Sequence, residues 1–337
     1  HDGARRQRRG GRAMSGQDRI DRRAALGLLG AGAASLVTGC STVIGARSPR
    51  MARALPDDLA VRYAVPEITA VRPEGTDEIG RAIRHRGRMD VLGHDLAYDF
   101  YVPERADGPV PFLLNLPILA GDKPVNRMVC KRLACFGIAS GTIERPGNLF
   151  RQCETLEQLN ENLVQTVRIQ RAFVDWAAQR DEVRSDELGV VGVSMGGMVG
   201  TLLGAVEPRL RTLSLCLAGA DFTDLLIHTN ERRANAWGRQ RTDIDGISMR
   251  ELQARASQSL VDEPARLARY IETEKVLFVT ARYDTTMPAR NSDLLWEALG
   301  RPERKYLPFE HYTAILAIDW MIDAVVTHSR RRFAGLA

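Results

Sequence analysis

The chain has 337 residues, 44% of them hydrophobic and 26% charged, with a formal net charge of +5. This length is sufficient for one large globular domain with a full hydrophobic core. Residues 1–39 hold eight arginines against three aspartates, so residues 40–337 balance to zero and a basic nucleic-acid-binding surface is not expected. Cys130, Cys135 and Cys153 show no metal-ligand spacing with histidine, and we expect no metal or other cofactor.

The first forty residues have the pattern of a bacterial export signal. After Met14, which we interpret as the start of the protein, a basic segment containing Arg22 and Arg23 leads into an uncharged run at 24–39, directly before Cys40. This run is shorter than the roughly 20 residues that span a bilayer. Cys40 in this position resembles the lipid-modified cysteine of a lipobox, and the arginine pair resembles a twin-arginine signal, with a Sec-type signal as the alternative. We therefore expect an exported protein that is lipid-anchored to the cell envelope through Cys40.

Residues 40–85 are expected to form a tether and an N-terminal extension, and residues 86–337 the main domain. Apolar and β-branched runs predict eight strands in this domain, with helical patterns between them, of which the longest covers 154–179. The elements predict an α/β fold with an eight-stranded, mostly parallel sheet flanked by helices. The strands are expected near 87–92, 96–103, 111–117, 135–142, 188–193, 212–218, 275–281 and 304–309.

A helical insertion is expected between the sixth and seventh of these strands, at 222–273. The insertion is rich in arginine, aspartate and glutamine, with leucines at helical intervals. We interpret it as a lid over the functional site. The alternative is a solvated helical excursion with no contact to substrate.

The segment Gly-Val-Ser-Met-Gly at 192–196 lies between a predicted strand and a predicted helix. In a Gly-x-Ser-x-Gly elbow the turn is so tight that only glycines fit beside the serine, and the strain exposes the hydroxyl above the sheet edge. The helix that follows presents its N-terminal N–H groups to whatever the serine attacks. Ser194 is therefore a candidate nucleophile, and the Met195 N–H a candidate oxyanion donor.

A candidate acid and a candidate base follow the elbow in the chain order that such a site requires. Asp284 comes just after the strand at 275–281, and His311 just after the strand at 304–309. Because the carboxyl ends of parallel strands gather at one edge of a sheet, both side chains can reach Ser194. His311 would accept the serine proton and return it to the leaving group, and Asp284 would orient the imidazole.

The second oxyanion donor is expected in the loop Leu-Pro-Ile-Leu-Ala-Gly at 116–121, after the third strand. Many esterases have His-Gly-Gly there, whereas this chain has Pro117 and Ile118. The donor is a backbone N–H, so the substitution does not exclude a hole. We favour Leu119, with Ile118 as the alternative.

Other residues compete for these roles. Asp221 follows the sixth strand and is a rival for the role of the acid, and Asp224 is a weaker rival. His228 lies in the insertion, where a surface histidine is usually only solvated. His85 and His94 precede the elbow, which breaks the order serine, acid, histidine.

Three ordered segments resemble the α/β-hydrolase superfamily, in particular its dienelactone-hydrolase and prolyl-oligopeptidase-like esterase branches. These segments are 191–197 around Ser194, 281–288 around Asp284, and 311–314 at His311, and the resemblance covers roughly residues 86–335. It implies ester, thioester or amide hydrolysis without a metal. We expect a serine carboxylesterase acting on a small-molecule ester, with a peptidase, an acyltransferase or a non-catalytic envelope protein as alternatives. The oligomeric state stays open.

Overall fold

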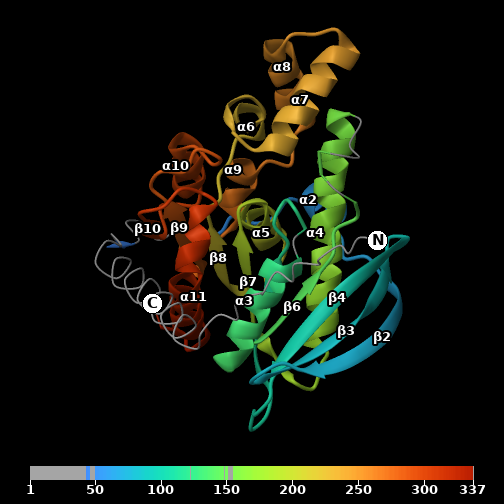
Figure 1. Cartoon of the computed structure of the whole chain (residues 1–337), viewed down its shortest axis with the longest axis vertical. Coiled ribbons are helices and arrows are strands. Elements are labelled where there is room, and N and C mark those ends of the chain that lie inside the picture. The colour runs from blue at the N-terminus through green and yellow to red at the C-terminus, as the bar shows by residue number, and fades with distance from the viewer. Residues whose placement is uncertain (1–42, 46–49, 122, 148, 151–154, 337) are drawn as a thin grey trace, which may run out of the picture.

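The structure is a computed structural model that describes residues 43–45, 50–121, 123–147, 149–150 and 155–336. The expected export signal, Cys40 and Cys153 lie outside these residues. A ten-stranded sheet runs through the molecule in the order β1-β10-β9-β8-β7-β5-β6-β4-β3-β2 (Figure 1). The strands are β1 (Val43–Ile44), β2 (Ile68–Glu78), β3 (Ala82–Val91), β4 (His94–Pro103), β5 (Val110–Leu116), β6 (Ala139–Ile143), β7 (Val183–Val193), β8 (Leu210–Cys216), β9 (Val276–Ala281) and β10 (Glu303–Leu307).

The sheet is parallel at its centre and antiparallel at its ends. The pairs from β10 through β9, β8, β7 and β5 to β6 are parallel, whereas β6–β4, β4–β3, β3–β2 and β1–β10 are antiparallel. The fold class expected from the sequence is confirmed, and all eight expected strands are present. The structure adds β1 and β2, which form the two edges of the sheet.

Helices cover both faces of this sheet. The helices are α2 (Asp57–Arg62), α3 (Lys123–Cys135), α4 (Leu156–Ala178), α5 (Met195–Val206), α6 (Phe222–His228), α7 (Arg232–Asp245), α8 (Met249–Ser259), α9 (Pro264–Leu267), α10 (Ala289–Ala298) and α11 (Ile318–Phe333), with short 3-10 turns at η1 (Ala268–Tyr270), η2 (Thr273–Lys275) and η3 (Thr313–Ala317). The longest, α4, begins at a capping box in which the Thr155 hydroxyl accepts the Gln158 N–H and the Gln158 side chain accepts the Thr155 N–H.

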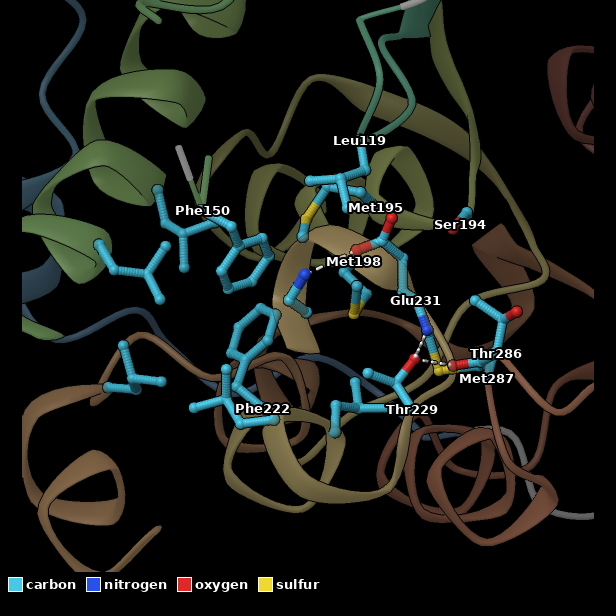
Figure 2. Close-up of a pocket in the computed structure, with 16 residues that line it drawn as sticks. Leu119, Phe150, Ser194, Met195, Met198, Phe222, Thr229, Glu231, Thr286 and Met287 are labelled. Carbon is cyan, nitrogen blue, oxygen red and sulfur yellow. Dashed lines mark hydrogen bonds between the residues drawn. The ribbon is translucent and has the colours of Figure 1, made fainter. Parts of the chain in front are cut away.

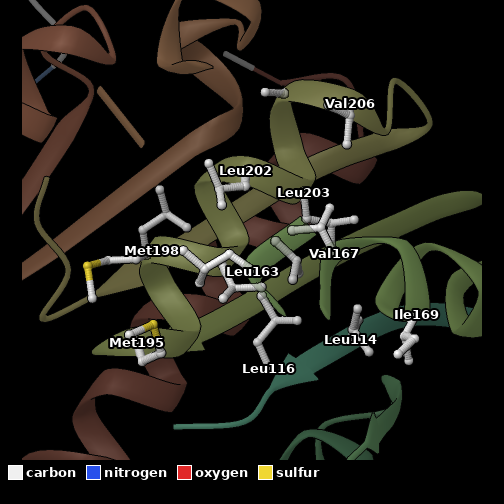
Figure 3. Close-up of a cluster of buried hydrophobic side chains, with 14 of the residues drawn as sticks. Leu114, Leu116, Leu163, Val167, Ile169, Met195, Met198, Leu202, Leu203 and Val206 are labelled. Carbon is white, nitrogen blue, oxygen red and sulfur yellow. The ribbon is translucent and has the colours of Figure 1, made fainter. Parts of the chain in front are cut away.

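Alternate residues along the central strands build two separate cores. Leu114 of β5 packs in one core with α4 and α5, while its neighbour Leu113 packs in the other with α3 and α11. This alternation follows from the period of two in a strand, which sends successive side chains to opposite faces. Figure 3 shows the first core, where Leu163 and Val167 of α4 meet the side chains of α5 above β5.

The insertion between β8 and β9 contains α6, α7, α8 and α9. In Figure 1, α7 and α8 lie beyond one end of the sheet, beside the start of α4. The Ser259 hydroxyl of α8 donates to Glu157 in the first turn of α4, which joins the insertion to the body of the protein. The insertion is therefore helical, as the sequence indicates.

The described part of 40–85 is packed against the rest of the protein. Arg50 donates to the carbonyls of Ala268 and Ala298, and Arg62 forms a bidentate pair with buried Asp262. β2 extends the sheet beside β3. From residue 50 onward, this segment is thus joined to the domain that was expected to begin at residue 86. Within the described residues, no helix has both the length and the hydropathy to cross a bilayer.

Candidate active site

The Ser194 elbow joins the end of β7 to the start of α5. Ser194 has φ 56° and ψ −120°, a strained backbone conformation for a residue with a side chain. A Cβ atom on Gly192 would lie 2.2 Å from the Gly196 carbonyl oxygen, and one on Gly196 would lie 2.7 Å from that of Leu116. Both positions therefore require glycine. The second approach also places the start of α5 against the end of β5, where the candidate oxyanion loop begins.

Ser194, His311 and Asp284 form a continuous hydrogen-bonded chain. His311 Nε2 lies 2.9 Å from Ser194 Oγ, and His311 Nδ1 lies 2.7 Å from Asp284 Oδ2. A carboxylate only accepts hydrogen bonds, so Nδ1 carries the proton and Nε2 is free to accept the serine hydroxyl. The His311 and Asp284 side chains are 7% and 4% exposed, respectively. The geometry is that of a serine, its base and the carboxylate that orients the base.

The competing acid Asp221 is occupied elsewhere. It caps α6 with φ 64°, and its carboxylate accepts the Thr223 hydroxyl and the Asp224 N–H. Its own N–H donates to Glu263, a carboxyl whose pKa is raised by burial. The contact joins the residue directly before the insertion to the last part of the insertion.

The remaining competitors also have other partners. Asp224 pairs with Arg290 and lies 3.5 Å from His228, whose side chain is exposed. His85 Nδ1 contacts the Thr76 hydroxyl, between β3 and β2. His94 begins β4. The structure thus brings Asp284, and none of these residues, to His311.

The loop after β5 forms a tight turn in which the Gly121 N–H donates to the Ile118 carbonyl at 2.9 Å. A planar trans peptide directs its N–H opposite to its carbonyl, so this bond fixes the direction of the Leu119 N–H. The Leu119 carbonyl accepts Arg145 Nη2 at 2.5 Å and Arg233 Nη1 at 3.3 Å. Neither arginine was expected at the site from the sequence, because their shared partner is a backbone carbonyl, which carries no residue-type signal.

Two hollows meet at Ser194. The smaller has a volume of about 50 Å³ and is almost wholly apolar (Figure 2). In that view, Phe150 and Phe222 form the side away from Ser194, with Met195 and Met198 between. The larger hollow, about 490 Å³, contains His311, Arg233 and Tyr312. Leu119, Ser194, Glu231 and Thr286 line both hollows.

The insertion forms much of the wall of the smaller hollow. Seven of its residues line that space: Phe222, Leu225, Leu226, Thr229, Glu231, Ala234 and Leu260. Thr229 and Glu231 are held in place, because the Thr229 hydroxyl donates to the Thr286 carbonyl and the Glu231 carboxylate caps α7. The insertion therefore contacts the space beside Ser194, unlike a purely solvated excursion. Among the residues that the structure describes, no group of three or more His, Cys, Asp or Glu side chains could hold a metal ion.

No protein-family model and no curated protein sequence matches this chain. Several solved structures match this chain at low sequence identity. Acetyl xylan esterase 1 from Thermoanaerobacterium sp. JW/SL YS485 is 16% identical with a TM-score of 0.60, over 79% of this chain and 92% of that one. The acetyl xylan esterase from Paenibacillus sp. R4 is 15% identical with a TM-score of 0.60, over 80% and 92%. Est1E from Butyrivibrio proteoclasticus is 17% identical with a TM-score of 0.53, over 74% and 99%. With the sheet order and the elbow described above, these likenesses show that the chain has the α/β-hydrolase fold.

Proposed function

We propose that this protein is a serine carboxylesterase that acts through an acyl-enzyme on Ser194. The observation that carries the proposal is the unbroken chain from Ser194 Oγ through His311 to Asp284, at 2.9 and 2.7 Å. A serine hydroxyl is a weak nucleophile at neutral pH and needs an adjacent base that is itself oriented. The similar folds of the acetyl xylan esterases support the same reaction class.

Each step of the proposed reaction has a group in position. Ser194 Oγ attacks the ester carbonyl carbon while His311 Nε2 takes the hydroxyl proton, which gives a tetrahedral oxyanion. The oxyanion collapses, the alcohol leaves with the proton from Nε2, and the acyl group stays on Ser194. Water then loses a proton to His311 and attacks the acyl-enzyme, which releases the acid and restores Ser194.

Two backbone N–H groups would stabilise the oxyanion. Met195 is the first residue of α5, so its N–H has no partner within the helix. The Leu119 N–H is directed by the turn from Ile118 to Gly121, and Leu119 lines both hollows beside Ser194. Ile118 lines only the larger hollow, which makes Leu119 the better second donor.

The two hollows assign the two halves of the ester. His311 must protonate the leaving alcohol, and it lines the larger hollow, so the alcohol belongs there and the acyl group in the smaller one. A volume of about 50 Å³ holds roughly four groups of water or methylene size. We therefore expect esters of short acyl chains, together with an alcohol of considerable size.

A fluorophosphonate probe tests this function, because it labels only an activated serine. The purified protein should be labelled, Ser194→Ala should not, and Ser257→Ala, which removes a hydroxyl from α8, should be labelled like the parent. Short-chain p-nitrophenyl esters should be hydrolysed by the parent and by Ser257→Ala only. If the parent is unlabelled, or if Ser194→Ala is labelled equally, the proposed serine esterase activity is refuted.

The proposed place of action is the outer side of a bacterial membrane. It rests on the basic segment, the uncharged run at 24–39 and Cys40, all outside the described residues. Expression in a bacterial host should place the parent in the membrane fraction and release Cys40→Ser from it. A Cys40→Ser protein that stays membrane-bound would contradict the lipid anchor.

A further inference from the structure

Two arginines from different parts of the chain hold one carbonyl of the oxyanion loop. Arg145 follows β6, and Arg233 lies in α7 of the insertion. Arg145 Nη2 and Arg233 Nη1 donate to the Leu119 oxygen at 2.5 and 3.3 Å, across 26 and 114 residues of sequence. Nothing in the proposed reaction uses either side chain directly, so their convergence needs a separate explanation.

Arg145 carries a buried charge that is expected to lower the stability of the folded protein. It is 8% exposed, and its Nη1 atom is buried without a hydrogen-bond partner. Burial and the nearby Arg233 lower its pKa to about 10, so it still carries a full charge at neutral pH. Arg145 makes no ion pair within the described chain, and a buried charge without a counter-charge destabilises a protein.

Arg145 differs from the arginines around it in the partner of its guanidinium group. It lines a cavity of about 200 Å³ together with four other arginines. Each of those four pairs with an aspartate: Arg84 and Arg127 with Asp99, Arg86 with Asp77, and Arg88 with Asp95. Only Arg145 among these five is held by a carbonyl instead of a carboxylate. Stability alone therefore does not account for it.

The carbonyl that the arginines hold belongs to the central peptide of the turn. The Gly121 N–H secures the Ile118 carbonyl, but the peptide between Leu119 and Ala120 takes no part in that bond. Rotation of a central peptide converts one common turn type into another. Here it would change ψ of Leu119 and φ of Ala120, and so the path of the loop that carries the Leu119 N–H. The two guanidinium groups oppose this rotation, because it would remove their shared acceptor.

We propose that Arg145 is a positioning residue that keeps the oxyanion loop in its working conformation. Arg233 adds a second hydrogen bond to the same carbonyl and so couples the loop conformation to the insertion. The inference rests on the proposed function. Loss of Arg145 should weaken the stabilisation of the oxyanion, which exists only during the reaction, and should leave ground-state binding of the ester intact. A buried guanidinium that serves only the loop should be dispensable for folding.

Arg145→Met tests this through kcat, which should fall, and the thermal midpoint, which should not fall. We expect kcat to fall roughly 10- to 100-fold, less than for loss of an oxyanion donor itself, with KM within about twofold of the parent and with a thermal midpoint equal to or above that of the parent. Arg145→Lys should restore part of kcat, since an ammonium can still donate to the carbonyl. Active sites are counted by fluorophosphonate titration, so that kcat refers to working enzyme.

Arg127→Met is the matched control, because it removes an arginine from the same cavity that does not touch the loop. It should keep the kcat of the parent. Arg233→Met removes the half-buried arginine of α7, which also lines the larger hollow, and should lower kcat less than Arg145→Met does. An unchanged kcat in Arg145→Met, or a lowered thermal midpoint, would overturn the inference. If the parent itself is inactive and Ser194 is unlabelled, the proposed function fails instead.

Discussion

Asp284 is bound to His311 through one carboxylate oxygen and to the backbone through the other. Its Oδ2 lies 2.7 Å from His311 Nδ1, whereas Oδ1 accepts the N–H groups of Thr286 and Met287 at 3.0 and 2.7 Å. The two backbone bonds fix the plane of the carboxylate before any substrate arrives. The imidazole therefore has one available tautomer and one orientation, with Nε2 toward Ser194.

Replacement of Asp284 by asparagine should keep this geometry and remove the proposed esterase activity. The amide oxygen can still accept a backbone N–H, but an amide N–H facing His311 favours the wrong imidazole tautomer. We expect kcat on a short-chain p-nitrophenyl ester to fall ~10⁴-fold, with little change in the thermal midpoint. The matched variant is Asp221→Asn, at the residue that caps α6, and it should retain most of the activity. A larger loss of activity in Asp221→Asn would contradict the assignment of the acid.

Much of this arrangement follows from strand order alone. Asp284 and His311 come just after β9 and β10, which are adjacent parallel strands, and Ser194 follows β7 in the same parallel block. The three side chains were therefore expected at one edge despite separations of 117 and 27 residues. The choice between Asp284 and Asp221 was harder, because both follow parallel strands and only tertiary contacts distinguish them.

The structural features that the sequence did not predict have no characteristic pattern of residue types. β2 contains Pro73 and Gly75 at a register shift and has no buried residue, so its sequence shows no hydrophobic run. Such an edge strand forms because the exposed edge of β3 offers hydrogen-bond partners. Likewise, the contacts of Arg145 and Arg233 depend on a carbonyl brought near by folding.

Gly192→Ala should disrupt the elbow. A methyl group there would lie 2.2 Å from a backbone oxygen of α5, a clash that only a backbone shift relieves. We expect loss of fluorophosphonate labelling and a fall in unfolding free energy of about 2 kcal/mol or more. Gly200→Ala is the control in the same helix, since the nearest contacts of its Cβ would be side-chain atoms, those of Leu215 and Leu116 at 3.0 and 3.2 Å and of Val190 at 4.0 Å. It should stay labelled and change stability by less than about 1 kcal/mol.

Under the proposed esterase function, Phe222→Ala should lengthen the acyl chain that is hydrolysed best. Phe222 lines the smaller hollow on the side away from Ser194 (Figure 2), so its removal adds space where the end of the chain would lie. Among p-nitrophenyl esters of two to twelve carbons, we expect the highest kcat/KM to move by several carbons toward longer chains. The cavity also costs roughly 3–5 kcal/mol of stability. Phe333→Ala removes a buried ring of α11 in the other core and should lower stability with no change in chain preference.

Because of the buried His328 side chain, the protein should be less stable in mild acid than at neutral pH. This side chain of α11 is 3% exposed; its Nε2–H donates to the Lys275 carbonyl, and its Nδ1 is buried without a partner. Burial lowers its pKa from 6.5 to about 4, with Glu303 opposing and Arg331 and Arg332 adding to the effect. Between these two pH values the unfolded chain binds a proton that the folded chain does not, so stability falls as the pH falls from 6.5 toward 4. The loss approaches roughly 3 kcal/mol at the lower end.

His328→Gln should remove this dependence, because its amide can donate to the same carbonyl but does not titrate. Urea unfolding at several pH values from 4.5 to 7.5 should give a shallower fall in unfolding free energy for His328→Gln than for the parent. His228→Gln replaces an exposed histidine and should keep the slope of the parent. Equal slopes for His328→Gln and the parent would show that His328 ionises alike in the folded and unfolded chain. The acid sensitivity would then belong to other groups.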